Sequence, residues 1–303
     1  MHIHVRYCIR TSLASIKSYL KPFYSYVYKY LIEEKPDIVF STHFLNSWAI
    51  AKIKKEYNLK VKLVTFVSEI FDVHSFWLID NVDCFIVTSA VAKDRLLERG
   101  IKEEKTYIMP YPIKNSFLDL NQNSCNKIRS QYSLDKGKKT LLISFGGQGI
   151  GNCDKYIDSL IKEQIPLNVI VVTAKNRELY EKLCQKYPNH KQTVSVYALG
   201  FVTNMNELIA VSDFCFIKSG PATTMEVLLL KKPIIFYKPA SGNEKGNITY
   251  CLENGIALYA GKSRKRFIKS IKSLFSEQKL QEIQANYQKI HIHNGSDNIA
   301  HFL

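Results

Sequence analysis

The chain has 303 residues, of which 46% are hydrophobic and 23% charged, a composition typical of globular proteins and not of disordered, collagen-like or low-complexity chains. No apolar run of about 18 residues occurs and the N-terminus lacks the apolar core of a signal peptide, so we expect a cytoplasmic protein without a membrane-spanning helix. The formal net charge of +15 predicts an anionic partner, either nucleic acid, an acidic membrane surface or a phosphorylated substrate.

Two acid-free stretches carry much of the positive charge, residues 1–30 and residues 262–272. Within the first, residues 11–31 interleave lysines with tyrosines and phenylalanines, a mixture that suits the headgroup layer of an anionic membrane. The alternative is a packing helix broken at Pro22 with solvated lysines. No RNA-binding motif accompanies the basic residues, so we expect no nucleic-acid partner.

Short apolar runs alternate with amphipathic stretches along most of the chain, which predicts an α/β protein with parallel sheets covered on both faces. The amphipathic stretches are at 47–57, 91–99, 154–163, 177–187, 204–211, 223–230 and 247–254. The predicted strands are at 38–41, 61–67, 84–88, 140–145, 168–173, 194–199, 214–218 and 233–237.

A polar, non-periodic stretch separates the strands into two groups. We therefore predict a first domain over 1–118 with about three strands, a linker over 119–138 and a second domain over 139–303 with five or six strands. All 13 glycines fall at residue 100 or later. Because a loop that brings its backbone against a phosphate normally needs glycine, phosphate chemistry is expected in the second domain.

Seven cysteines are scattered singly, which favours reduced, buried thiols over a disulfide scaffold. The pairs His2/His4 and His291/His293 are spaced for a metal but have no carboxylate or cysteine companions, so no designed metal site is predicted.

Three loops of the second domain follow predicted strands and combine glycine with polar residues. The first, Phe145 to Gly151, would free backbone N–H groups for an anion at the start of a helix, although a tight turn would also use glycine. The second, Lys218 to Glu226, opens a helix whose first turn could bind a diphosphate without a cationic side chain. There, Glu226 could accept both hydroxyls of a ribose, or could instead complete a helix cap with a threonine.

The third loop, Pro239 to Asn247, places amide and carboxylate groups where sugar hydroxyls are read in such sheets, although strings of this kind are often no more than exposed turns. All three loops would lie at the carboxyl edge of one parallel sheet. Their coincidence predicts a nucleotide-sugar site.

Ordered motifs support this prediction: GFVTNMNEL from Gly200, SDF from Ser212, KSGPATTMEVL from Lys218 and PASGNEKGN from Pro239. This series resembles the GT-B nucleotide-sugar glycosyltransferases with a MurG-type C-terminal domain, in particular the monogalactosyl- and processive glucosyl-diacylglycerol glycosyltransferases. Weaker matches at 35–43, 68–77 and 108–113 extend the resemblance to about residue 35. It implies two Rossmann-like parallel-sheet domains.

Members of this family open with a strand and a glycine-rich loop that ends in a histidine, and this sequence has no such loop. The first domain is therefore expected to be incomplete. We expect one of three explanations: a shortened gene model, a second polypeptide that supplies the missing part, or a catalytically impaired protein.

The resemblance implies roles for individual residues of the donor site. Phe201 would cover the uracil, Glu226 would hold the ribose, and Asn243 and Glu244 would contact the hexose. Gly220, Pro221, Thr223 and Thr224 would contact the diphosphate. The loop residues Gly146, Gly147, Gln148 and Gly149 would face the donor phosphate from across the cleft, and Ser219 and Asn247 complete the expected donor site.

The resemblance also implies an inverting transfer without metal or cofactor, in which a carboxylate or imidazole of the first domain deprotonates the acceptor hydroxyl. The candidates for this base are Glu69 and His74. The expected partners are a UDP-sugar, a membrane lipid acceptor and an anionic membrane surface, with peripheral attachment to the inner face of the plasma membrane.

Three functions remain open from the sequence. The first is hexosyl transfer from a UDP-sugar to diacylglycerol or a lipid-linked glycan. The second is UDP-GlcNAc transfer to a lipopolysaccharide or undecaprenyl-linked intermediate. The third is a nucleotide-sugar-binding subunit or remnant that is inactive alone.

Overall fold

The structure is a computed structural model that describes residues 21–147, 152–188, 193–239, 242 and 244–303. The chain forms two compact units. Unit 1 comprises the residues up to Ser68 together with Val73–Ile108, and unit 2 comprises Glu69–Asp72 and Met109–Phe302. No helix in the described ranges is long and apolar enough to cross a membrane.

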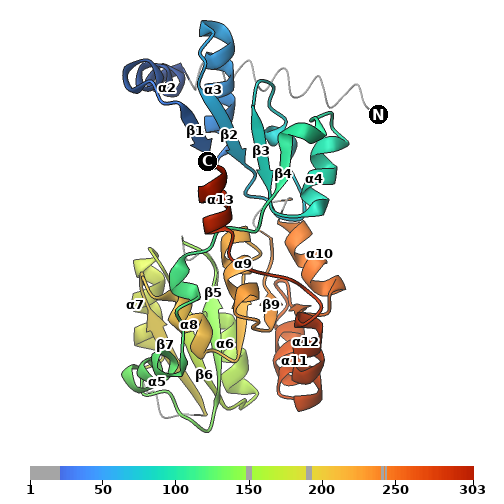
Figure 1. Cartoon of the computed structure of the whole chain (residues 1–303). Helices are drawn as coiled ribbons and strands as arrows, with labels where there is room; N and C mark the ends of the chain where they lie inside the picture. Colours follow the sequence, from blue (N-terminus) through green and yellow to red (C-terminus); the bar gives the residue numbers. More distant parts are fainter. Residues whose placement is uncertain (1–20, 148–151, 189–192, 240–241, 243) are drawn as a thin grey trace. The chain divides into compact units, whose positions relative to one another are not determined.

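Unit 1 contains a four-stranded parallel sheet in the order β1-β2-β3-β4 (Figure 1). Its strands are β1 (Ile38–Ser41), β2 (Lys62–Phe66), β3 (Cys84–Val87) and β4 (Thr106–Ile108), and its helices are α2 (Lys21–Glu34), α3 (Phe44–Tyr57) and α4 (Ala90–Leu97), with short 3-10 turns at Ser75–Trp77 and Glu103–Lys105. All four residues of β3 are buried, as expected for a strand covered on both faces. The largest buried side chain of this unit is Trp77, which packs beside Phe85 and Leu63.

Unit 2 contains a six-stranded parallel sheet in the order β10-β9-β8-β5-β6-β7. Its strands are β5 (Lys139–Ser144), β6 (Leu167–Val172), β7 (Val194–Leu199), β8 (Phe214–Ile217), β9 (Ile234–Phe236) and β10 (Ala257–Tyr259). Its helices are α5 (Gln122–Gln131), α6 (Asp154–Lys162), α7 (Arg177–Lys186), α8 (Met205–Val211), α9 (Pro221–Leu229), α10 (Lys245–Glu253), α11 (Arg264–Leu274), α12 (Glu277–Tyr287) and α13 (Ser296–Phe302), with a 3-10 turn at Asn115–Phe117.

The strand order reverses direction at β5, and this reversal distributes the helices over two faces. The chain moves from β5 to β6 and β7 on one side, then returns to β8, β9 and β10 on the other. Because strand–helix–strand crossovers are right-handed, α6 and α7 cover one face while α8, α9 and α10 cover the opposite face. The last strand leads into α11, which packs against α6 and therefore lies on the first face (Figure 1).

The sheets confirm the predicted α/β class and locate every predicted strand. Two short strands, β4 and β10, were missed. The predicted division differs from the observed one: the boundary between the two units lies at Ile108–Met109, whereas the sequence placed it near residue 118. The stretch 119–138, expected to be a linker, contains α5 and buries Ile128 and Leu134 in the core of unit 2.

Candidate functional site

The start of α9 presents main-chain N–H groups that no side chain caps. Strand β8 ends at Ile217, and Gly220 occupies the N-cap position with Pro221 as the first helical residue. Proline has no N–H to satisfy, so the N–H groups of the next two residues, Ala222 and Thr223, are those oriented out of the helix. The sequence left open that a threonine caps this helix; here the N-cap is Gly220, without a side-chain cap.

The turn before α9 is fixed by the turn before α10. The side-chain amide of Asn247 donates to the carbonyl of Ser219 at 2.7 Å, and both residues are buried. The hydroxyl of Ser219 donates to Glu244 Oε2 at 3.3 Å. A Cβ added at Gly220 would lie 4.0 Å from the other oxygen of Glu244. Two of the three predicted loops therefore meet beside the start of α9.

The glycine loop after β5 approaches the same turn. Gly146 has a φ of +84°, a conformation that favours glycine, and a Cβ added there would lie 3.8 Å from Lys218 Nζ. A cation thus lies beside a loop to which the sequence assigned only main-chain donors. Gly147 has open space around its α-carbon, whereas Gln148 and Gly149 lie outside the described residues, as does Asn243 of the third loop.

Glu226 is a half-buried carboxyl group in the second turn of α9. Burial raises its pKa to about 7, and the ammonium of Lys114 partly opposes this shift. Burial, together with the nearby Glu226 carboxylate, also raises the pKa of Tyr111 to about 12. One turn of α9 therefore carries a carboxyl group that ionises near neutral pH, and the buried hydroxyl of Thr224 has no hydrogen-bond partner among the described atoms.

Phe201, expected to cover the uracil, follows β7 and is 70% exposed. A large aromatic ring left this open is available to stack on a flat ligand. Phe201 follows β7, whereas Ser219 follows β8 and Glu244 follows β9. A base stacked on Phe201 would therefore lie at the end of a third strand of the same sheet.

The two candidate bases fall in different units. His74 belongs to unit 1, where its Nδ1 accepts the main-chain N–H of Phe76 at 3.1 Å and so caps a short turn. Its ring also packs against the ring of Phe76 at 4.3 Å. Glu69 belongs to unit 2. The structure does not bring Glu69 and His74 together in one compact unit.

Glu69 is attached to unit 2 by its chain neighbours. Ile70 enters the hydrophobic core of that unit, and Phe71 stacks on Tyr250 of α10 with centroids 3.7 Å apart. A Cβ added at Gly246 would approach Asp72 to 2.8 Å, so only glycine allows this packing. Segment 69–72 is thereby fixed against the first turns of α10, directly after Glu244.

Several residues that shape the site escaped the sequence analysis. Lys114 opposes the rise in the pKa of Glu226 from a segment more than a hundred residues away, and Glu226 in turn raises the pKa of Tyr111 in the same segment. Phe71 anchors the Glu69 segment through Tyr250. Of these residues, the sequence analysis covered Tyr111 and Phe71 only within the weaker family matches at 108–113 and 68–77. In the described ranges, no cluster of three metal-ligating side chains occurs.

Two family models match the chain. The model described as monogalactosyldiacylglycerol (MGDG) synthase matches residues 7–113, and the glycosyltransferase family 28 C-terminal domain matches residues 150–247. The first match begins closer to the N-terminus than the resemblance found from residue 35. The second covers the start of α9, Glu226 and the turn before α10.

Solved structures share the fold at low sequence identity. MurG from Acinetobacter baumannii superposes with a TM-score of 0.67 at 12% identity, over 91% of this chain and 75% of that one. MnaA from S. aureus, solved with UDP, gives a TM-score of 0.67 at 16% identity over 91% and 76%. Anabaena HepE in complex with UDP-glucose gives 0.63 at 17% over 93% and 81%. Together with the two family models, this fold defines a glycosyltransferase of the GT-B type.

Two curated relatives identify a particular family within the GT-B glycosyltransferases. A processive diacylglycerol β-glucosyltransferase from Bacillus licheniformis is 30% identical over 273 residues, covering 88% of this chain and 67% of its own length. The corresponding Bacillus subtilis protein is 29% identical over 270 residues, covering 88% and 68%. The chain belongs to this family of diacylglycerol glycosyltransferases. It spans about two thirds of the length of the curated relatives that it matches.

Proposed function

We propose that the chain transfers a hexosyl group from a UDP-sugar to diacylglycerol, with inversion at the anomeric carbon and without a metal ion. The observation that carries the proposal is the uncapped start of α9, because free N–H groups and the positive end of the helix dipole bind a diphosphate. The family supports a lipid acceptor, and relatives of the same fold have been solved with UDP and UDP-glucose.

The donor would bind along the carboxyl edge of the sheet of unit 2. The diphosphate would accept from the N–H groups of Ala222 and Thr223, with Lys218 nearby, and the ribose would donate both hydroxyls to ionised Glu226. Phe201 would stack on the uracil. Glu244, held by Ser219, would accept from hydroxyls of the hexose.

Catalysis would depend on stabilising the negative charge that develops on the leaving group. As the bond between the anomeric carbon and the β-phosphate oxygen breaks, the departing UDP gains charge next to the fixed N–H groups; one such preorganised donor contributes about 3 kcal/mol. A base removes the proton of the acceptor hydroxyl, whose oxygen attacks the anomeric carbon from the opposite side. We favour Glu69 as this base, because His74 already uses Nδ1 to cap a turn.

Peripheral membrane contact is proposed from α2. Tyr26 and Tyr30 are 69% and 53% exposed on this helix, and only Leu31 is buried. Pro22 lies in its first turn and does not break it. Exposed aromatic rings beside Lys29 suit a headgroup layer, which would bring unit 1 to the acceptor.

The direct test is transfer from radiolabelled UDP-glucose to diacylglycerol in mixed vesicles containing phosphatidylglycerol, with and without EDTA. The proposal predicts a glucolipid with β configuration by proton NMR and a rate that EDTA leaves unchanged. Parallel assays with UDP-galactose and UDP-GlcNAc show which sugar the protein transfers. Binding of UDP-glucose without transfer to any lipid would instead support a binding subunit, and absence of binding would refute the donor site.

A further inference from the structure

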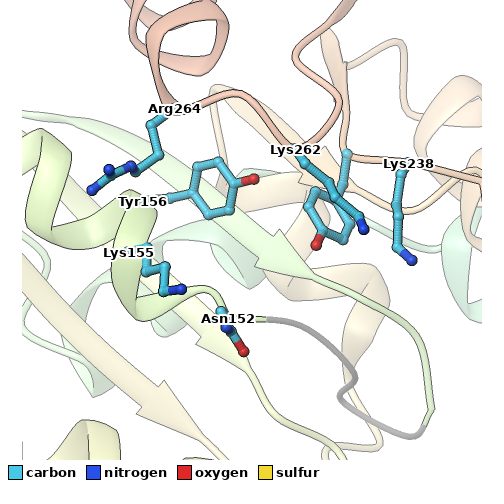
Figure 2. Close-up of a pocket in the computed structure, with 7 residues that line it drawn as sticks. Asn152, Lys155, Tyr156, Lys238, Lys262 and Arg264 are labelled. Carbon is cyan, nitrogen blue, oxygen red and sulfur yellow. The ribbon is translucent and has the colours of Figure 1, made fainter.

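Unit 2 contains a polar hollow whose lining residues are all distinct from those of the proposed donor site. Its volume is about 580 Å³, within the usual range of small-molecule sites. The lining residues come from the start of α6, the end of β9 and the start of α11, and they are Asn152, Lys155, Tyr156, Tyr237, Lys238, Lys262 and Arg264. We name this feature the basic hollow (Figure 2).

The helices that line the basic hollow lie on the opposite face of the sheet from the helices of the proposed donor site. Its lining helices, α6 and α11, pack on each other, and Tyr156 of α6 meets Phe267 of α11 edge to face with centroids 5.0 Å apart. The proposed donor site is built on α9 and α10, which the right-handed crossovers place on the other face. The two sites therefore use different helices and share no residue, although both lie at strand ends of the same sheet.

Four cations line the basic hollow, and no carboxylate does. The acidic groups of α6 and of its C-cap form ion pairs with other residues: Asp154 pairs with Lys182 at 2.8 Å, Asp158 with Lys186 at 2.6 Å, and the C-cap Glu163 with Lys272 at 2.6 Å. Among the residues that the structure describes, none of the four cations of the hollow forms an ion pair. Concentrating unpaired like charge in one concavity raises the local positive potential and attracts anions.

The lining consists mainly of hydrogen-bond donors. Lysine and arginine side chains have donors and no acceptor, and in Figure 2 Lys262 and Arg264 lie on the two sides of the Tyr156 ring. Burial raises the pKa of Tyr156 to about 12, so its phenol keeps its proton at neutral pH, and Tyr237 shifts in the same direction for the same reason. Such a lining matches a ligand made of acceptor oxygens.

We infer that the basic hollow binds a phosphoryl group, as a second anion site of this protein that is separate from the nucleotide. Lys238 and Lys262 contact the phosphoryl oxygens, Lys155 and Arg264 add positive charge to the lining, and the starts of α6 and α11 add the positive ends of two helix dipoles. The same chemistry is offered by free inorganic phosphate and by the phosphodiester of a lipid headgroup. The experiment separates these two sources.

The test measures binding of inorganic phosphate by calorimetry, and cosedimentation with phosphatidylglycerol-containing vesicles against pure phosphatidylcholine vesicles. The double variant Lys262→Gln/Arg264→Gln is compared with Lys265→Gln/Lys269→Gln, a matched loss of two charges from exposed residues of α11 that do not line the hollow. We expect the first to weaken binding at least about tenfold and the second to change it less than about twofold.

Each outcome decides the inference. Phosphate binding with this pattern supports a free-phosphate site, and vesicle binding alone with this pattern supports a headgroup site. Absence of both, or equal losses in the two double variants, overturns it. Displacement of phosphate by UDP-glucose also overturns it, because the hollow would then belong to the donor site. Lys238→Gln, on a different element, repeats the test if the first variant fails to fold.

Discussion

Replacing Glu226 with glutamine tests two properties of this carboxyl group: its effect on the stability of unit 2 and its proposed role in binding the ligand. The carboxyl of Glu226 has its pKa raised by burial from 4.5 to about 7. The folded state therefore holds a proton that the unfolded chain releases at lower pH. The contribution of Glu226 to the unfolding free energy is therefore fully present below pH 4.5 and is lost as the pH rises to about 7, where the folded carboxyl also ionises.

The size of this effect follows from the shift. A displacement of this size corresponds to about 3 kcal/mol of unfolding free energy, nearly all of which has been lost at pH 8. The Glu226→Gln variant cannot ionise. Its unfolding free energy should therefore exceed that of the wild type by an amount that grows by about 2 to 3 kcal/mol between pH 5 and pH 8.

The same substitution should weaken ligand binding. If ribose hydroxyls donate to ionised Glu226, UDP-glucose should bind the wild type about tenfold more tightly at pH 8 than at pH 6, because the ionised fraction rises by that factor around a pKa of 7. The glutamine variant should bind weakly at both pH values. UDP-glucose is the appropriate probe because its diphosphate diester does not titrate in this range.

Denaturant unfolding monitored by far-UV circular dichroism and calorimetric titration measure the two quantities on the same samples, since both tryptophans, Trp48 and Trp77, lie in unit 1 and would not report on unit 2. The control is Glu253→Gln, an exposed carboxylate at the end of α10. The reasoning is refuted if Glu226→Gln is less stable than the wild type at pH 8, or if its affinity for UDP-glucose equals that of the wild type across the pH range.

Three further predictions concern the packing of segment 69–72 and the identity of the base. Gly246→Ala should lower the unfolding free energy by about 1 to 3 kcal/mol, because the added Cβ meets Asp72 at 2.8 Å. The control Gly200→Ala has open space around the added Cβ and should lower it by less than about 1 kcal/mol. Equal effects of the two substitutions would contradict the close packing at Gly246. His74→Ala should lower the unfolding free energy by about 1 kcal/mol, because the side chain that caps the turn Ser75–Trp77 is lost. His74→Asn should retain both stability and turnover. A stable but inactive His74→Asn variant would instead identify this histidine as the base. Glu69→Gln should reduce kcat about a hundredfold or more with unchanged UDP-glucose affinity, and normal turnover would exclude Glu69.

The strands were predictable because most are buried on both faces and therefore read as continuous apolar runs. Every residue of β6 and β8 is buried, and both runs were recognised. The two missed strands each have only three residues and lie at sheet edges, and Ile108 of β4 is 51% exposed. An edge strand exposes part of its surface, so its hydrophobic pattern is weaker.

The candidate site was predictable where its elements are consecutive in sequence, as in the turn from β8 into α9. Contacts between distant segments were not. The proximity of Lys218 to Gly146, the effect of Lys114 on Glu226, and the packing of Asp72 on Gly246 all arise from tertiary packing. The fold was therefore recoverable from local patterns, whereas the electrostatics of the site required the structure.

The most direct test of the account is a crystal structure of the protein with UDP-glucose, grown in the presence of EDTA. The account predicts that diphosphate oxygens lie within hydrogen-bonding distance of the N–H groups of Ala222 and Thr223, with the ribose hydroxyls on Glu226. A nucleotide bound away from the start of α9, or a diphosphate bridged by a metal ion, would contradict it.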